Sequence, residues 1–214
     1  MARLTREQLE AKYEAMLEFE HHYEELGYKV IAGIDEAGRG PLAGPVVAAA
    51  CVLDPKNPIL GLDDSKKLSV KKREQLFDEI KEKALAYSVQ RVEADVIDQI
   101  NILEATKQCM RNCVAELLEG DLKPDLLLID AVKLDGTGLE VVPIIKGDAK
   151  SDSIAAASIL AKVTRDRIMV EYDKEYSGYG FAAHKGYGTA AHYAAIREKG
   201  MCPIHRRSFL KVIH

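Results

Sequence analysis

The sequence predicts an α/β fold in which a mixed five-stranded sheet is flanked by helices, with an added helix at the N-terminus. Residues 29–35 and 46–53 are rich in Val, Ile and Ala, and the loop between them is too short for a crossover helix, so they should pair antiparallel. Later strand-like segments alternate with helical ones, which favours a mixed sheet covered by helices. The apolar run at residues 126–129 is typical of a strand buried on both faces.

Local signals place the individual elements. Thr5 and Gln8 have the spacing of a capping box and Gly27 suits a helix C-terminus, so a first helix is expected over residues 6–26. Its apolar stripe needs a surface to pack on, and we expect a helical appendage, residues 1–27, docked on a catalytic domain, residues 28–214. The five strands are expected at residues 29–35, 46–53, 86–92, 125–130 and 141–145. The further helices are expected at residues 70–84, 101–118, 152–173 and 188–199.

Composition limits the function classes. With 214 residues, 47% of them hydrophobic, the chain can form one sizeable domain. It has no apolar stretch of membrane-spanning length and its first twelve residues lack a signal core, so neither export nor membrane insertion is expected. The four cysteines form no Cys-x-x-Cys pair, which favours a reduced, cytoplasmic protein. We further expect a monomer.

Charge is distributed unevenly along the chain. The net charge of −4 seems to argue against a nucleic-acid partner, but residues 1–27 alone carry seven Glu against three Lys or Arg. Residues 146–214 carry twelve basic and seven acidic side chains. A basic lobe beside an acidic centre suits a polyanion-binding metalloenzyme, although a solvated basic surface is the simpler alternative. The basic C-terminal half, with Arg206 and Arg207, is expected to contact phosphates.

Two adjacent carboxylates, Asp35 and Glu36, precede a loop rich in glycine and proline. Carboxylates would repel a bare phosphodiester, so their position beside glycine amides and Arg39 makes sense if a divalent cation lies between acid and phosphate. A capped turn with a solvated acidic pair is the alternative. Neighbours in a regular strand point to opposite faces, so the two acids can share a metal only if the strand ends or bulges between them.

Two further acids are expected at element ends. Asp130 ends the buried fourth strand, where ligands bind in open α/β sheets, and Asp148 follows Lys146 and Gly147 just before a long helix. Taken singly, each could be a turn or capping residue. Taken with Asp35 and Glu36, they form an oxygen-only set, which selects Mg²⁺ or Mn²⁺ over zinc.

The sequence resembles type 2 ribonuclease H, the ribonuclease HII family, in ordered blocks between residues 28 and 209. The blocks are DEAGRGPLAGPVVAA at 35–49, DSKKLS at 64–69, the strand ending at Asp130, residues 146–166, HKGYGT at 184–189 and PIHRRSF at 203–209. The resemblance implies a ribonuclease H-like fold and metal-dependent endonucleolytic hydrolysis of RNA in RNA:DNA hybrids. It also implies cutting at single ribonucleotides embedded in duplex DNA, with 3′-hydroxyl and 5′-phosphate ends, as needed in DNA replication and ribonucleotide excision repair.

The same resemblance implies roles for individual residues. The catalytic and metal-binding acids would be Asp35, Glu36, Asp130 and Asp148, holding two Mg²⁺ or Mn²⁺ ions. The substrate-binding residues would be Gly38, Arg39, Gly40, Ser65, Lys66, Lys146, Tyr187, Arg206 and Arg207. Within this set, the glycine loop and Tyr187 would read the ribonucleotide junction, because glycine lets the backbone approach a 2′-hydroxyl closely.

Two other functions stay open from the sequence alone. A non-catalytic nucleic-acid or nucleotide-binding domain could use the same basic face and glycine loop, although acids beside a phosphate-contacting loop count against it. A related-fold exonuclease or strand-transfer nuclease could also use clustered acids. Cleavage of a uniform DNA duplex would separate that second alternative from a ribonuclease.

Overall fold

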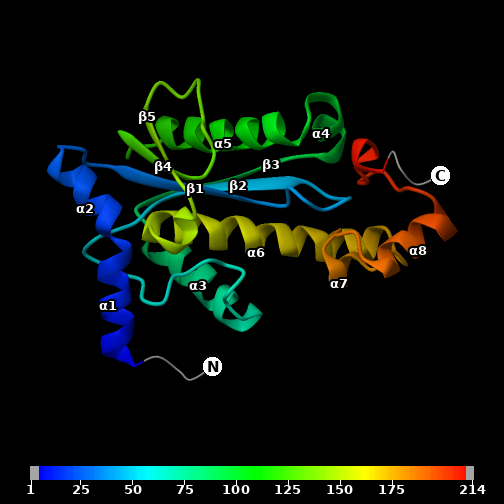
Figure 1. Ribbon diagram of the computed structural model, residues 1–214, viewed down its shortest axis with the longest axis horizontal. Helices are drawn as coiled ribbons and strands as arrows, with labels where there is room; N and C mark the ends of the chain where they lie inside the picture. The colour runs from blue at the N-terminus through cyan, green and yellow to red at the C-terminus, as the bar shows by residue number, and fades with distance from the viewer. Residues whose placement is uncertain (1–4, 211–214) are drawn as a thin grey trace.

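A five-stranded mixed sheet forms the centre of the protein in the computed structural model, which describes residues 5–210 (Figure 1). The strands are β1 (Ile31–Ala37), β2 (Val46–Val52), β3 (Ala86–Val92), β4 (Leu126–Asp130) and β5 (Glu140–Ile144). Their order across the sheet is β3-β2-β1-β4-β5, with β1, β2 and β3 antiparallel and with β4 parallel to both β1 and β5. The predicted mixed sheet is therefore confirmed.

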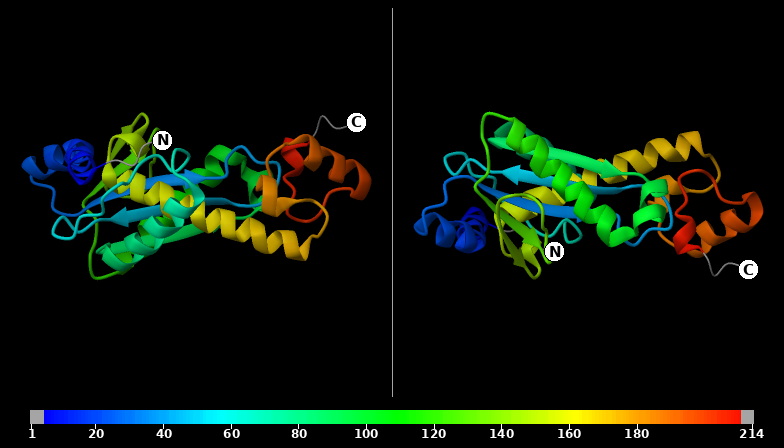
Figure 2. Two further views of the ribbon diagram at one scale, coloured as in Figure 1. Left: turned by 90° about the horizontal axis from the view of Figure 1, so that it is seen from below. Right: turned by 90° about the horizontal axis from the view of Figure 1, so that it is seen from above.

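Helices cover both faces of the sheet (Figures 1 and 2). On one face α5 (Ile102–Glu119) packs on β2 and β3, and on the other α6 (Asp152–Glu175) packs on β1 and β2, with α3 (Val70–Lys83) against it. β2 consists of Val, Ala and Cys and is buried at every position, since helices lie on both of its sides. The close approach of α6 requires Gly33, because a Cβ there would lie 2.1 Å from the carbonyl carbon of Ser153.

The N-terminal region departs from the single helix expected over residues 6–26. It forms α1 (Arg6–Met16) and α2 (Glu18–Glu25), which meet at Leu17, while the predicted capping box of Thr5 and Gln8 is confirmed. The break buries both Met16 and Glu20 against the body of the protein.

The helix expected at residues 101–118 is preceded by an additional one, α4 (Ala94–Ile100). Asn101 separates the two helices with a φ of 68°, and its side chain caps α5 by accepting hydrogen bonds from the amides of Leu103 and Glu104. Asn101 thus ends α4 and begins α5 as a favourable N-cap.

The two ends of the sheet carry different elements (Figures 1 and 2). α1 and α2 lie at one end, whereas α7 (Phe181–His184) and α8 (Ala190–Lys199) lie at the other. Two short 3₁₀ helices, η1 (Gly147–Ala149) and η2 (Arg207–Phe209), complete the described elements. Within residues 5–210, no helix combines the length and the hydropathy needed to cross a membrane.

Candidate metal centre and substrate cleft

Three of the four predicted acids converge at one edge of the sheet. Asp35 lies on β1 and Asp130 ends β4, and these strands are parallel, so their carboxyl ends reach the same edge. Asp148 comes from η1, which follows the next parallel strand, β5. One carboxylate oxygen from each of the three residues lies within 4.8 Å of those of the others.

Glu36 lies beside this group rather than in it. The condition stated for a shared metal, an end or bulge of the strand between Asp35 and Glu36, is not met, because β1 runs to Ala37 and Glu36 pairs in regular register with Ala48. Glu36 nevertheless lines the same cleft as Asp35. Its Oε1 lies 3.5 Å from a guanidinium nitrogen of Arg39, and its buried Oε2 has no hydrogen-bond partner within the described chain.

Burial and neighbouring acids raise the pKa values of Asp35 and Asp148. Burial raises the pKa of Asp35 well above its ordinary value, and the neighbouring Glu36 and Asp130 raise it further. Burial also raises the pKa of Asp148 to about 6, with added repulsion from Asp64 and Asp130. Such a group holds its negative charge at an energetic cost, which an added cation would relieve.

Lys66 supplies part of the compensating positive charge. Burial acts to lower the pKa of this ammonium group, but the negative charges of Asp64, Asp35 and other nearby acids raise it overall. Asp64 thus belongs to the electrostatic surroundings of the site, although the sequence analysis gave it no role. Its position in the DSKKLS block, directly before Ser65 and Lys66, was the available signal.

The donor set fits a hard divalent cation. The clustered ligands are carboxylate oxygens, as Mg²⁺ and Mn²⁺ prefer, and neither histidine nor cysteine joins a group of this kind within residues 5–210. The buried, unpartnered Oε2 of Glu36 is a further oxygen in the same cleft.

Asp35 and Glu36 line a cleft of about 300 Å³ that brings most of the predicted substrate-binding residues together. Gly38, Arg39, Gly40, Ser65, Lys66 and Tyr187 line it along with Asp35 and Glu36. Tyr187 is 46% exposed, and its ring would lie 3.7 Å from a Cβ placed on Gly40. An accessible aromatic face therefore stands beside the glycine loop.

Arg206 does not reach this cleft, contrary to the sequence-based expectation. The residue is 0% exposed, because its guanidinium lies beneath the glycine loop and donates hydrogen bonds to backbone carbonyls. The acceptors are the carbonyl oxygens of Gly38 at 2.6 Å, Arg39 at 2.9 Å, Pro41 at 2.9 Å and Gly44 at 3.0 Å. A guanidinium enclosed in this way is not available to a phosphate.

Arg165 on α6 supports the same loop, which the sequence analysis missed. Its guanidinium donates to the carbonyl oxygens of Pro45 at 3.0 Å, Ala43 at 3.1 Å and Lys185 at 3.0 Å. A Cβ at Gly38, where φ is +97°, would lie 2.0 Å from Arg165 Nε, so glycine is required there. The available sequence signal for this supporting role was the spacing of Arg165. It lies four residues from Ala161 and four from Met169, and both of these residues are buried.

The two remaining predicted residues lie outside the lining of the cleft. Lys146 is exposed next to Gly147 and has a φ of 58°. Arg207 is exposed as well, and its backbone amide donates to Asp98 at 2.8 Å.

Comparisons with known proteins identify the family that the chain matches. The family model described as Ribonuclease HII matches residues 32–212. A ribonuclease HII from Ruminiclostridium cellulolyticum is 56% identical over 200 residues, and one from Acetivibrio thermocellus is 57% identical over 202 residues. Each alignment covers 94% of this chain and 77% of the relative.

Solved structures share the fold. Ribonuclease H2 from Pyrococcus horikoshii OT3 matches with a TM-score of 0.69 and 29% identity over 84% of this chain and 93% of that one. RNase HII from Archaeoglobus fulgidus, solved in a complex with PCNA, matches with a TM-score of 0.70 and 29% identity over 83% of this chain and 94% of that one. Bst-RNase HIII, solved with Mn²⁺, is 19% identical with a TM-score of 0.59 over 87% of this chain and 66% of that one, and shows the fold alone.

The ribonuclease H fold, the acids at the carboxyl ends of its parallel strands and the extent of the family match lead to one conclusion. The chain belongs to the ribonuclease HII family and is an endoribonuclease, a hydrolase that acts on phosphodiester bonds of RNA paired with DNA.

Proposed function

We propose that the protein cuts at single ribonucleotides embedded in duplex DNA as well as within longer RNA:DNA hybrids, leaving 3′-hydroxyl and 5′-phosphate ends. The observation that carries this proposal is the cleft in which Asp35 and Glu36 stand next to the Gly38–Gly40 loop and Tyr187. Groups suited to holding cations and groups suited to recognising a sugar therefore face the same space.

The acids would hold two Mg²⁺ or Mn²⁺ ions. Asp35 is the acid best placed to bridge them, because it belongs to the cluster with Asp130 and Asp148 and also lines the cleft with Glu36. Glu36 would bind from the side of the cleft nearest Arg39. When bound, such ions supply activation of the attacking water and stabilisation of the leaving 3′-oxygen. The carboxylates themselves act as ionised ligands rather than as proton shuttles.

The glycine loop would distinguish RNA from DNA through the 2′-hydroxyl. Arg206 engages the carbonyl oxygens of Gly38 and Arg39 from below. The backbone amides of Arg39 and Gly40 donate to no group within the described residues and remain free for a ligand. A 2′-hydroxyl can accept from such an amide, and it can donate to a carboxylate or a carbonyl.

A cleavage assay on three substrates tests the proposal. The substrates are a DNA duplex with one embedded ribonucleotide, a long RNA:DNA hybrid and a uniform DNA duplex, each incubated with Mg²⁺, with Mn²⁺ or with a chelator. We expect metal-dependent cutting of the first two. A ligase tests the ends, because it can join the products only where a 5′-phosphate is present. Cutting of the uniform duplex would instead favour a related-fold deoxyribonuclease activity.

Tyr187 provides a test of junction reading. An aromatic face stacked on the nucleotide next to the ribonucleotide is worth about 1–3 kcal/mol. Tyr187→Ala should therefore lower kcat/KM on the single-ribonucleotide duplex by about tenfold more than on the long hybrid. Tyr187→Phe keeps the ring and is the matched control. An equal loss on both substrates would mean that Tyr187 supports general binding or the fold.

A further inference from the structure

Glu20 on α2 is a buried carboxylate that reaches the first turn of α6. It is 7% exposed, and its Oε1 accepts hydrogen bonds from the hydroxyl of Ser151 at 2.6 Å, from the amide of Ser153 at 3.1 Å and from the hydroxyl of Ser153. A negative group at this place satisfies a free amide of the helix N-terminus and complements the helix dipole. Glu20 therefore caps α6 from a different helix.

The capped turn is connected to the candidate metal centre by backbone hydrogen bonds. The amide of Ser151 donates to the carbonyl oxygen of Gly147 at 2.9 Å, and the amide of Gly147 donates to Oδ1 of Asp130 at 2.7 Å. Asp148 lies between these two points, on η1. A continuous set of hydrogen bonds thus runs from Glu20, through the segment that carries Asp148, to the carboxylate of Asp130.

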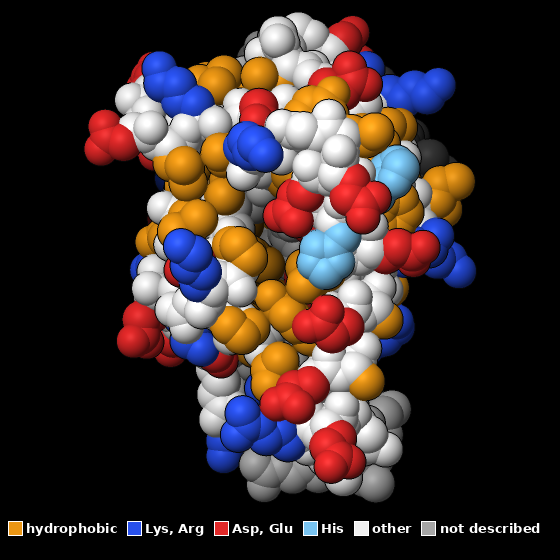
Figure 3. Space-filling view, turned by 90° about the vertical axis from the view of Figure 1, so that its left-hand side faces the viewer, with side chains coloured by type: hydrophobic (Ala, Val, Ile, Leu, Met, Phe, Trp, Pro, Cys, Tyr) orange, Lys and Arg blue, Asp and Glu red, His pale blue; other side chains and the backbone are white. Residues whose placement is uncertain are grey.

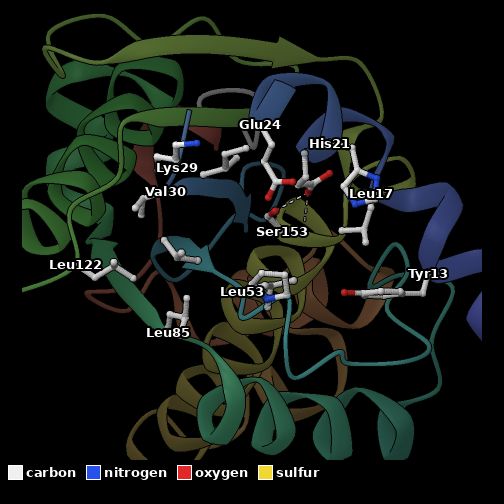
Figure 4. A pocket seen from close by; sticks show the side chains of 14 residues that line it. Tyr13, Leu17, His21, Glu24, Lys29, Val30, Leu53, Leu85, Leu122 and Ser153 are labelled. Carbon is white, nitrogen blue, oxygen red and sulfur yellow. Dashed lines mark hydrogen bonds between the residues drawn. The ribbon is translucent and has the colours of Figure 1, made fainter. Parts of the chain in front are cut away.

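Apolar packing around Glu20 is incomplete. The face that bears α1 and α2 is hollowed, with acidic, histidine and hydrophobic side chains around the hollow (Figure 3). A pocket of about 130 Å³ lies there, and residues such as Tyr13, Leu17, His21 and Leu53 line it (Figure 4). Polar and apolar contacts share the attachment. Lys12 contacts the Leu62 carbonyl oxygen at 2.8 Å and Asp63 at 2.7 Å, and Met16 is buried in a hydrophobic cluster of the main body.

We propose that Glu20 is a positioning residue for the metal centre. By fixing Ser151 and Ser153, it sets the position of η1 and with it the carboxylates of Asp148 and Asp130. This inference rests on the proposed metal-binding role of those two acids. Residues that orient metal ligands through hydrogen bonds typically change metal affinity by about 10–100-fold when they are replaced.

The test is a calorimetric titration of the full chain with Mn²⁺. Glu20→Ala removes the acceptor, and we expect the Mn²⁺ dissociation constant to rise by about tenfold. Glu20→Gln keeps an acceptor oxygen and should restore most of the affinity. Glu18→Ala removes an exposed glutamate from the same helix and should leave the affinity unchanged. Thermal unfolding of each metal-free variant, and the Mn²⁺ concentration that gives half-maximal cleavage, are measured alongside.

The outcomes separate this inference from the proposed function. If Glu20→Ala lowers only the melting temperature and binds Mn²⁺ like the wild type, the positioning role is overturned while the metal site stands. If the wild type itself binds no Mn²⁺, or if Asp35→Asn binds it equally well, the proposed metal site fails first. Should Glu20→Ala not fold, Ser153→Ala decides by the same titration, because it removes one hydroxyl donor to Glu20 and keeps the Ser151 hydroxyl that caps α6.

Discussion

The cluster of acids and the pair of buried arginines differ in how their charges are compensated. Asp35, Asp130 and Asp148 gather negative charge, and burial together with mutual repulsion raises the pKa of Asp35 and of Asp148. Arg165 and Arg206 gather positive charge, yet their guanidiniums donate seven hydrogen bonds to backbone carbonyls. The first group needs an added cation, whereas the second is already satisfied.

This difference distinguishes a functional buried charge from a structural one. Burial lowers the pKa of Arg165 to about 10, and burial together with repulsion from Arg165 lowers that of Arg206 to about 9. Both groups therefore remain ionised at neutral pH, and neither forms an ion pair with a carboxylate within residues 5–210. Their positive field lies beneath the loop proposed to meet a phosphodiester, so they can favour an anion without contacting it.

The largest predicted effect is on stability, and it is expected at Arg206. Replacing it with methionine keeps much of the volume but leaves up to four carbonyl oxygens without a donor, three of them in buried hydrogen bonds. We expect Arg206→Met to lower the free energy of unfolding by about 3 kcal/mol, measured by urea denaturation. Arg207→Met, at the exposed neighbour, is the matched control and should change stability by less than about 0.5 kcal/mol.

The salt dependence of substrate binding is a second test of whether Arg206 is structural. A side chain that contacts a phosphate contributes about one unit to the slope of log affinity against log salt. Arg206→Met removes a positive charge, yet it should leave this slope nearly unchanged, because the guanidinium of Arg206 bonds backbone carbonyls beneath the loop and contacts no phosphate. A flatter slope with unchanged stability would mean that Arg206 contacts the substrate and that the distinction drawn here fails.

The next largest effect is on catalysis, at Asp35. Asp35→Asn keeps the shape of the side chain and removes a negative charge from the acid cluster. We expect kcat to fall at least about a hundredfold, as for other preorganised electrostatic groups, while the metal-free protein keeps or gains stability. Asp95→Asn, at an exposed acid of α4, serves as the control for charge alone. Near-native turnover of Asp35→Asn would show that Asp35 is not a bridging ligand.

Most of the sheet and the location of the acid cluster could be predicted from sequence, because local patterns determine them. The strand at residues 86–92 has the predicted bounds, and the strand-end position of Asp130 follows from the apolar run before it. Asp35 and Asp130 were each expected near a strand end, where ligands bind in open α/β sheets, and the parallel pairing of β1 with β4 brings these two ends together.

The remaining features depend on tertiary contacts that no local pattern encodes. Whether Arg206 faces solvent or the underside of a loop depends on where residues 38–44 lie, more than 160 positions earlier in the chain. After the break at Leu17, α2 likewise places Glu20 in contact with Ser151 and Ser153, more than 130 positions later in the chain. The roles of Arg206 and Arg207 were therefore predicted from the basic composition of the C-terminal half. Arg206 proved instead to be structural.

The smallest predicted effect concerns Asp148 in the acid cluster. Burial and repulsion, chiefly from Asp64, raise the pKa of Asp148 to about 6 from an ordinary value of 3.8. The folded protein therefore binds this proton more tightly than the unfolded chain does. The resulting destabilisation is absent below about pH 4, grows as the pH rises to about 6 and is complete above that value. Asp148→Asn removes it.

Thermal unfolding of the metal-free proteins across this pH range measures the effect. We expect Asp148→Asn to melt about 2–4 °C above the wild type at pH 7.5, since about 1 kcal/mol corresponds to such a shift in a chain of this size. The two curves should converge near pH 4. With saturating Mn²⁺ at pH 7.5 the order should reverse, because the ion stabilises the protein that binds it more tightly. If the difference in melting temperature does not vary with pH, the gain comes instead from a new amide hydrogen bond. Asp148 would then not be an uncompensated charge like Asp35.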